Sequence, residues 1–452
     1  MRLLVPGAAA LATDVLGFLV ILYIEIDIVR ELGITASLGL AVMILTNMLL
    51  LPVWLSHTRL APAEITRTRR WERRGERLWR ALTRLTEPRP AAVVLAAAAV
   101  LGVFGFIAAQ RLHTGDLGEG LPELRAESRY NRDTAAITGR FSIGVDVLSV
   151  IAETRTPGAC TRFEVMDAID RFEWRMRQVE GVHSVLSLPG VAKVIASGWN
   201  EGSLKWRALA RDPKVLAQSV TPVDTATGLL NTDCSVMQVM LFMNDHQGET
   251  IARVVEEIKQ FKRVHDSEQL RFRLAAGNVG VMAATNEAVD AAQVVMTVAI
   301  FGAIVVLCLA TFHSWRAVLC ILLPLALATT LCQALMALLG IGLKVSTLPV
   351  IVLGVGIGVD YGIYLYERLQ EHRRRGATLA EAFHEALRER GAAAMFTAAT
   401  MTVGVGSWAF SALKFQADMG LLLAFMFFAN MLGAVLLLPA LAAFLDRVRA
   451  PR

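Results

Sequence analysis

The 452-residue sequence lacks the motifs that most often identify a soluble enzyme. It contains no GxxxxGK[ST] loop, so an ATP-driven mechanism has no support, and neither HExxH nor GxSxG occurs. Charged residues are scarce at 19%, against roughly 25% in an average soluble domain. Hydrophobic residues make up 55% of the chain. This composition excludes a soluble enzyme and a nucleic-acid binder, and the net charge of +5 is poor evidence for nucleic acid.

The sequence contains several long runs of apolar residues. Several approach or exceed the ~20 residues that a helix needs to cross the hydrocarbon core of a bilayer. The sequence therefore predicts a polytopic α-helical membrane protein. Eight spans are expected at roughly 8–28, 34–55, 90–110, 292–312, 317–339, 346–366, 392–412 and 419–443.

The distribution of basic residues predicts the topology. Four segments carry them: the arginine-rich stretch 56–89, the loop with His313 and Arg316, the loop 373–375, and the tail 444–452. All four fall on one side if the spans alternate, and the positive-inside rule makes that side the cytoplasm. We expect both termini to be cytoplasmic and residues 111–291 to be periplasmic, in a bacterial inner membrane.

The basic segment 56–89 also has an apolar stripe. Trp71, Leu78, Trp79, Leu82 and Leu85 recur at near-helical spacing among arginines. This pattern is typical of an amphipathic helix on the inner membrane surface, and a solvated basic linker is the alternative.

The segment 111–291 is long enough for a domain. Strands are predicted at 145–152, 181–188, 235–243 and 269–276, with helices at 161–179 and 248–263. The order β-α-β, insertion, β-α-β favours a ferredoxin-like split βαβ fold. His183, His246 and His265 have no metal-ligand spacing. We therefore expect neither a metal site nor a catalytic site in this domain.

An internal repeat divides the chain. GAAALAT at 7–13 matches GAAAMFT at 391–397, and TNMLLLP at 46–52 matches ANMLGAVLLLP at 429–439. Repeats of this kind are common in transporters. Residues 1–55 are then the tail of a first repeat, and the second repeat comprises span 90–110, domain 111–291 and the bundle 292–443. The chain is interpreted as a fragment or a late-start product, with a natural eight-span protein as the alternative.

The segment GVGIGVDYG at 354–362 is the most specific motif. With TDVLGF at 13–18 and ELGITASLG at 31–39, it resembles the resistance-nodulation-division (RND) superfamily of exporters, in its MMPL and Patched-like branch. The resemblance covers essentially the whole chain, as the last eight of twelve spans. It implies proton coupling through Asp360 and Tyr361 and a periplasmic porter domain for hydrophobic or lipid-like substrates. The family's matching Asp-Tyr pair on a fourth span is absent from this sequence.

The residues around Asp360 support a functional carboxylate independently. A charged aspartate at mid-membrane costs ~2.5–3.5 kcal/mol on insertion scales, so it is usually kept for pairing or proton transfer. Gly354, Gly358 and Gly362 form one helical stripe that favours close helix packing, whereas Asp360 lies on the face of Gly356. A purely structural, hydrogen-bonded aspartate is the alternative.

Further candidate residues are few. Asp14 belongs either to the relay or to a polar cavity, and Thr397 and Thr400 could supply hydroxyl groups. In a split βαβ fold, Cys160 follows the first strand and Cys234 opens the adjacent third strand. We therefore predict a disulfide between them, which an oxidising periplasm permits.

Two function classes remain open from the sequence. The first is a proton-motive-force-driven exporter of lipidic or hydrophobic compounds. The second is a non-transporting, sterol-sensing-type membrane module that binds a lipid or a partner. No cofactor is expected. The expected partners are protons, membrane lipids, a lipid-like substrate, and either the missing N-terminal half or further copies of the chain.

Overall fold

The computed structural model describes residues 4–24, 26–57, 75–118, 120–141 and 144–449. It divides into a helical unit, Met1–Leu112 with Ala288–Arg452, and an α/β unit, His113–Glu287. Trp71 and the arginines of 58–74 lie outside the described residues, as does the end of the tail beyond residue 449.

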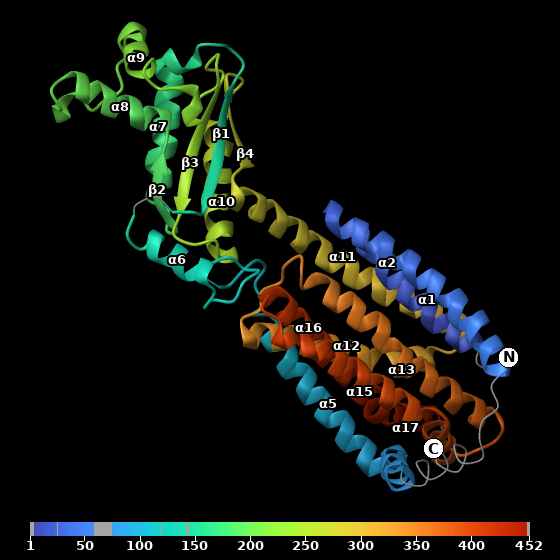
Figure 1. Cartoon of the computed structure of the whole chain (residues 1–452). Helices are drawn as coiled ribbons and strands as arrows, with labels where there is room; N and C mark the ends of the chain where they lie inside the picture. Colours follow the sequence, from blue (N-terminus) through green and yellow to red (C-terminus); the bar gives the residue numbers. More distant parts are fainter. Residues whose placement is uncertain (1–3, 25, 58–74, 119, 142–143, 450–452) are drawn as a thin grey trace. The chain divides into compact units, whose positions relative to one another are not determined.

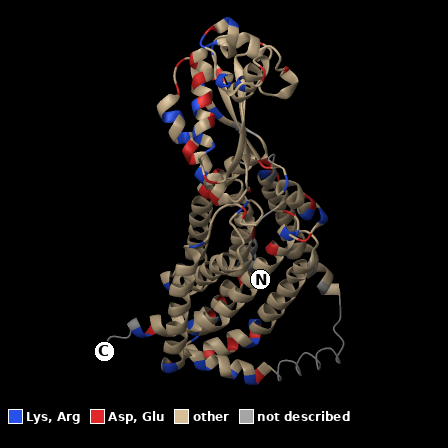
Figure 2. Cartoon of the chain, turned by 90° about the vertical axis from the view of Figure 1, so that its left-hand side faces the viewer, with Lys and Arg blue, Asp and Glu red and all other residues tan. Residues whose placement is uncertain are grey.

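The helical unit consists of long apolar helices whose charged residues gather toward the helix ends (Figure 2). Six of the eight predicted spans correspond to helices long and apolar enough to cross a membrane: Pro88–Ala109, Asn278–Phe312, Trp315–Leu339, Leu348–Arg374, Leu379–Phe410 and Lys414–Arg447. The two N-terminal predicted spans are helical, and their crossing of a membrane stays a prediction. The helices are α1 (Leu4–Ile21), α2 (Asp27–Leu45), α3 (Leu51–His57), α5 (Pro88–Ala109), α11 (Asn278–Phe312), α12 (Trp315–Leu339), α13 (Leu348–Arg374), α14 (Leu379–Ala386), α15 (Ala392–Gly406), α16 (Lys414–Leu432) and α17 (Leu438–Arg449).

Helix α13 is the central element of the helical unit. In its most apolar window 78% of the residues are buried, against 11% in α5. It packs against α1, α12, α14 and α16 (Figure 1). The helix that carries the GVGIGVDYG motif is therefore surrounded by other helices, and its side chains contact protein on most sides.

Two matching segments of the internal repeat share a local distortion. A π-helical turn, Thr46–Leu50, precedes Leu51 and Pro52, and a second, Gly433–Leu437, precedes Leu438 and Pro439. Proline lacks the N–H that would complete an α-helical turn, and a π turn is one way for the helix to accommodate it. The repeat seen in the sequence thus has a counterpart in the backbone.

The described part of the basic linker is helical, and its position on a membrane surface stays a prediction. Residues 75–83 are helical, but Trp79 is buried at 5% exposure rather than turned toward a membrane surface. A Cβ atom added at Gly391 would lie 3.3 Å from the Trp79 ring. Thr83 Oγ1 also lies 3.2 Å from His384 Nδ1 on α14. Trp79 packs inside the helical unit against the π-helical turn Leu387–Gly391 that follows α14, whereas Leu78 of the same stripe is exposed.

The α/β unit is built on a four-stranded antiparallel sheet in the order β2-β3-β1-β4. The structure contains all six strands and helices predicted for 145–276. The strands are β1 (Val147–Thr154), β2 (Val182–Leu186), β3 (Val236–Met243) and β4 (Leu270–Ala276), and the helices are α6 (Arg129–Thr138), α7 (Phe163–Met176), α8 (Leu188–Trp199), α9 (Pro213–Val220) and α10 (Gly248–His265).

The core of the α/β unit lies between the sheet and helices α7 and α10 (Figure 1). Phe172 of α7, Phe261 of α10 and Phe272 of β4 meet there, with ring centroids 5.0–5.4 Å apart. The insertion between β2 and β3 forms α8 and α9, which pack against each other. The unit thus has a hydrophobic core of its own.

Candidate functional site

One face of α13 is held close to α16 by its glycines. A Cβ atom added at Gly354 would lie 2.6 Å from Met426 Cε, and one at Gly358 would overlap the Asn430 amide. Asn430 Nδ2 donates a hydrogen bond of 2.8 Å to the Gly354 carbonyl oxygen. Only glycine fits at both positions, because any side chain would push the two helices apart.

Gly362 continues this stripe against another helix. A Cβ atom added there would lie 3.2 Å from Ile321 Cγ2 on α12. The stripe therefore contacts both α12 and α16, and a small cavity beside it is lined by Gly358, Pro324 and Asn430.

The other face of α13 carries Gly356 and Asp360 toward α1. A Cβ atom added at Gly356 would lie 3.6 Å from Asp14 Oδ1 and 3.9 Å from the Thr13 carbonyl oxygen. One turn along α1, a Cβ atom at Gly17 would lie 3.7 Å from Val352 Cγ1. Residues four apart share a helix face, so Gly356 leaves room for Asp14 beside Asp360.

Asp14 and Asp360 form the polar centre of this helix contact. Both residues are partly buried, and their carboxylates interact electrostatically. The Oδ1 atom of each is buried and has no hydrogen-bond partner among the described residues. Buried polar atoms without partners are rare in folded proteins and need an explanation, such as an unseen water or proton.

Tyr361 lies next to Asp360 but belongs to the hydrophobic core. It is buried, and its hydroxyl oxygen has no hydrogen-bond partner in the described part of the chain. Since neighbouring residues on a helix point ~100° apart, Tyr361 and Asp360 do not share a face.

Thr397 and Thr400 occupy a different environment from Asp360. Both are exposed on α15. The Thr400 hydroxyl donates to its own helix, with 3.0 Å to the Phe396 carbonyl oxygen and 2.9 Å to that of Thr397. Of the candidate relay partners, Asp14 is the one that the structure places against the Gly356–Asp360 face.

Three further polar residues of the helical unit were not singled out from the sequence. Asn430 contacts the glycine stripe, and Thr402 has a buried hydroxyl without a partner among the described residues. Arg368, two turns beyond Asp360 on α13, lies 3.3 Å from Glu367 and 3.4 Å from Glu389. An asparagine within the apolar run LLLAFMFFANML was a signal that could have identified Asn430.

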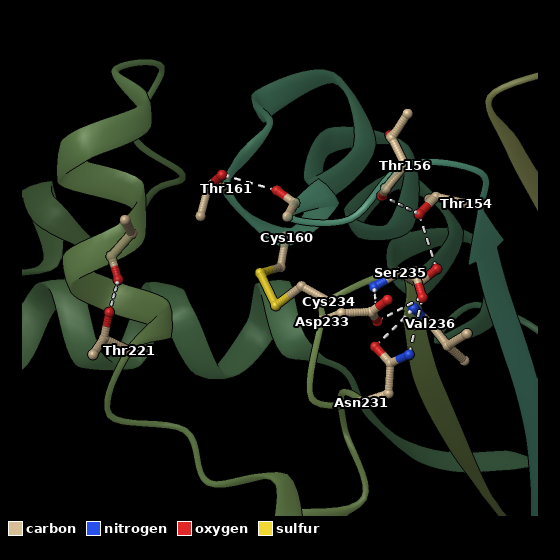
Figure 3. Close-up of a disulfide and its surroundings, with 12 residues drawn as sticks. Thr154, Thr156, Cys160, Thr161, Thr221, Asn231, Asp233, Cys234, Ser235 and Val236 are labelled. Atoms are coloured by element: carbon tan, nitrogen blue, oxygen red, sulfur yellow. Dashed lines mark hydrogen bonds between the residues drawn. A yellow bond between two sulfur atoms is a disulfide. The ribbon is translucent and has the colours of Figure 1, made fainter.

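The α/β unit carries the disulfide Cys160–Cys234, with a Cα–Cα distance of 5.5 Å (Figure 3). Cys234 has a left-handed backbone (φ 55°), and Asp233 beside it accepts hydrogen bonds from the amide (3.1 Å) and hydroxyl (2.7 Å) of Ser235. These bonds lower the pKa of Asp233. The disulfide thus joins the turn before β3 to the segment after β1.

A second polar pair lies at the other end of β1. His246 is buried, and its Nδ1 atom is 3.0 Å from Asp146 Oδ2. The hydrogen bond to Asp146 raises the pKa of His246, against the opposing effect of burial. Neither His246 nor the other histidines belong to a metal-binding group among the described residues.

Comparison with known proteins places the chain among membrane proteins. Residues 164–452 match the MMPL family. "Putative membrane protein MJ1562" of Methanocaldococcus jannaschii is 26% identical over 318 residues, which cover 67% of this chain and 78% of that protein. "Putative membrane protein SCO6666" of Streptomyces coelicolor is 34% identical over 89 residues, 20% of this chain and 13% of that protein. The family match includes the whole of α13, α15 and α16.

Proposed function

Since the chain belongs to the MMPL family of the RND superfamily, we propose that it acts in proton-motive-force-driven export of lipidic or hydrophobic compounds. The observation that carries this proposal is the contact between Asp14 of α1 and the Gly356–Asp360 face of α13. It supplies two carboxylates with unpartnered oxygens inside an otherwise apolar bundle.

The chemistry of the pair suits proton transfer. Two negative charges in a low-dielectric bundle repel strongly, so the pair favours states in which at most one carboxylate is charged. Each proton gained or lost then changes the attraction between α1 and α13. The unpartnered oxygen on each residue is where a proton or a water would bind.

The packing of α13 against α16 allows a change at the α1–α13 contact to move α13 within the bundle. Its opposite face meets α16 at Gly354 and Gly358, where small residues allow helices to shift without large side-chain clashes. We infer that protonation at the α1–α13 contact biases the position of α13 between two packing arrangements. Such a two-state element is what couples a proton to movement of substrate.

The α/β unit is proposed to be the periplasmic porter domain, of the ferredoxin-like type. The strand order β2-β3-β1-β4 and the two βαβ units support this interpretation. An eight-span topology with cytoplasmic termini is part of the same proposal. The disulfide supports an oxidising compartment for this unit.

A transport assay tests the proposal. We expect the full chain in proteoliposomes to couple movement of a fluorescent phospholipid analogue to an imposed proton gradient. Asp14→Asn and Asp360→Asn should each abolish the coupled movement, because an amide cannot titrate. Thr397→Ala, an exposed residue on α15, is the matched control and should retain it.

The outcome separates the two function classes. If the analogue binds but no proton gradient drives its movement, the chain is a lipid-binding module rather than an exporter. If the wild type transports and both Asn variants match its rate, the carboxylates are structural and the proton-relay mechanism is wrong.

A further inference from the structure

A projecting turn of the α/β unit carries large apolar side chains into solvent. The turn, residues 198–208, begins with the last two residues of α8, and every residue from 201 to 208 is exposed. Trp199 is 72% exposed, Leu204 77% and Trp206 57%. Nothing in the described part of the chain covers these side chains. Clustered exposed side chains of this size usually mark an interaction surface.

Hydrogen bonds hold the turn in its projecting form. The Gly202 amide donates to the Ser197 carbonyl oxygen at 2.9 Å, and the Ser197 hydroxyl donates to the Ser203 carbonyl oxygen at 3.1 Å. Before the turn, Ala192 of α8 is buried in the core, and after it Leu209 packs against the same core. The backbone that carries the two tryptophans is therefore fixed to the core of the unit on both sides of the turn.

Basic residues accompany the apolar ones. Lys205 and Arg207 flank Trp206, and Lys214 follows on α9. None of the three forms an ion pair with a described residue, whereas Lys193 on α8 pairs with Asp170 at 2.5 Å. Glu201 is the acidic residue of the turn. The surface thus combines exposed tryptophans with cations that are available to an external anion.

We propose that the 198–208 turn binds the surface of an anionic lipid membrane. Tryptophan prefers the headgroup region, where its ring is apolar and its N–H can donate a hydrogen bond. Lysine and arginine extend past the apolar zone to lipid phosphates. The sequence LKWR at 204–207 places both residue types on one short helical turn, Leu204–Trp206.

The exposure and the charge of the turn favour a lipid surface over a protein partner. Protein interfaces concentrate tryptophan and arginine in well-packed central pockets that exclude water. Here Trp199, Leu204 and Trp206 are each more than half exposed, on the segment that joins α8 to α9 (Figure 1). An exposed cationic and aromatic turn can insert into a soft headgroup layer.

The test measures binding of the full chain to a second membrane. The chain is held in nanodiscs of phosphatidylcholine and mixed with vesicles of phosphatidylcholine, either alone or with phosphatidylglycerol. Co-flotation reports binding, and empty nanodiscs give the background. We expect binding to the vesicles that contain phosphatidylglycerol, weakened by salt and largely absent with phosphatidylcholine alone.

Two paired variants locate the surface. Lys205→Gln with Arg207→Gln should weaken binding roughly twenty-five-fold, at about fivefold for each cation near an anionic surface. Trp199→Ala with Trp206→Ala should weaken it by at least about tenfold. Trp174→Ala removes an equally exposed tryptophan (66%) from α7 and should bind like the wild type.

The design distinguishes failure of folding from failure of binding. The oxidised Cys160–Cys234 bond, verified by mass spectrometry in each variant, reports an intact unit. The proposal is overturned if the wild type does not bind phosphatidylglycerol vesicles. It is equally overturned if intact paired variants bind as tightly as the wild type, or if Trp174→Ala weakens binding as much as they do.

Discussion

Breaking the disulfide of the α/β unit should lower the stability of that unit without affecting the helical unit. Cys160 and Cys234 are separated by 74 residues and connect the segment after β1 to the start of β3. In the chain-entropy relation, closing a loop of this length reduces the entropy of the unfolded chain by an amount worth about 4.5 kcal/mol at 25 °C. Measured effects of native disulfides in small domains lie at ~2–5 kcal/mol, so this figure is near the upper end.

Hydrogen exchange in the full chain measures this loss locally. For β1 and β3 amides that exchange only when the unit unfolds, a loss of about 4.5 kcal/mol in its free energy of unfolding corresponds to roughly two-thousandfold faster exchange. The variant Cys160→Ala with Cys234→Ala should show this acceleration. For a unit of this size, the same loss should lower its melting temperature by roughly 10–15 °C.

A matched control separates the disulfide from general effects of cysteine removal. Cys308 is a free, buried cysteine of α11, and Cys308→Ala should leave exchange in β1 and β3 unchanged. The reasoning is refuted if the wild-type protein has free thiols at 160 and 234 after oxidative purification. Unchanged exchange in β1 and β3 after verified loss of the bond would refute it as well.

Three further predictions concern single side chains. Because the pKa of His246 is raised in the folded unit, its protonated form stabilises the α/β unit. This stabilisation is complete below about pH 6.5 and is lost as the pH rises through the raised pKa. The variant His246→Gln should therefore remove this pH dependence from hydrogen exchange in β1. Gly358→Ala forces a methyl group into the α16 contact and should cost ~1–3 kcal/mol in detergent unfolding, whereas Gly404→Ala, with no atom within 4 Å of its Cβ position, should be neutral. Trp79→Ala should destabilise the helical unit by ~3–5 kcal/mol in the same assay, because Trp79 is buried, while exposed Leu78→Ala should change little.

Local patterns in the sequence predicted the long helices of the helical unit and the strands and two longest helices of the α/β unit, but not α6, α8 and α9. The segments VDVLSVIA and SVMQVMLFM were predicted as strands and correspond to β1 and β3, and the helix predicted at 248–263 corresponds to α10. The sequence places Gly354, Gly358 and Gly362 on one face of α13, since helical periodicity alone decides which residues share a face, and in the structure they lie against α16 and α12.

Contacts between distant helices could not be predicted in the same way. The meeting of Asp14 with the Gly356–Asp360 face depends on which helix packs against α13, and periodicity within one helix carries no such information. The burial of Trp79 depends likewise on α14 and the adjoining turn, which lie far along the chain. A hydroxyl such as that of Thr397 resembles a site residue in sequence, although its side of α15 is exposed.

Infrared difference spectroscopy of the full chain in lipid tests most directly whether the Asp14–Asp360 pair binds and releases a proton. The account predicts that a pH step changes the C=O stretching band of a protonated carboxyl group. That change should be lost in Asp360→Asn and lost or shifted in frequency in Asp14→Asn, because the two carboxylates interact. A pH-dependent band that is identical in the wild type and both variants, or no such band in the wild type, would contradict it.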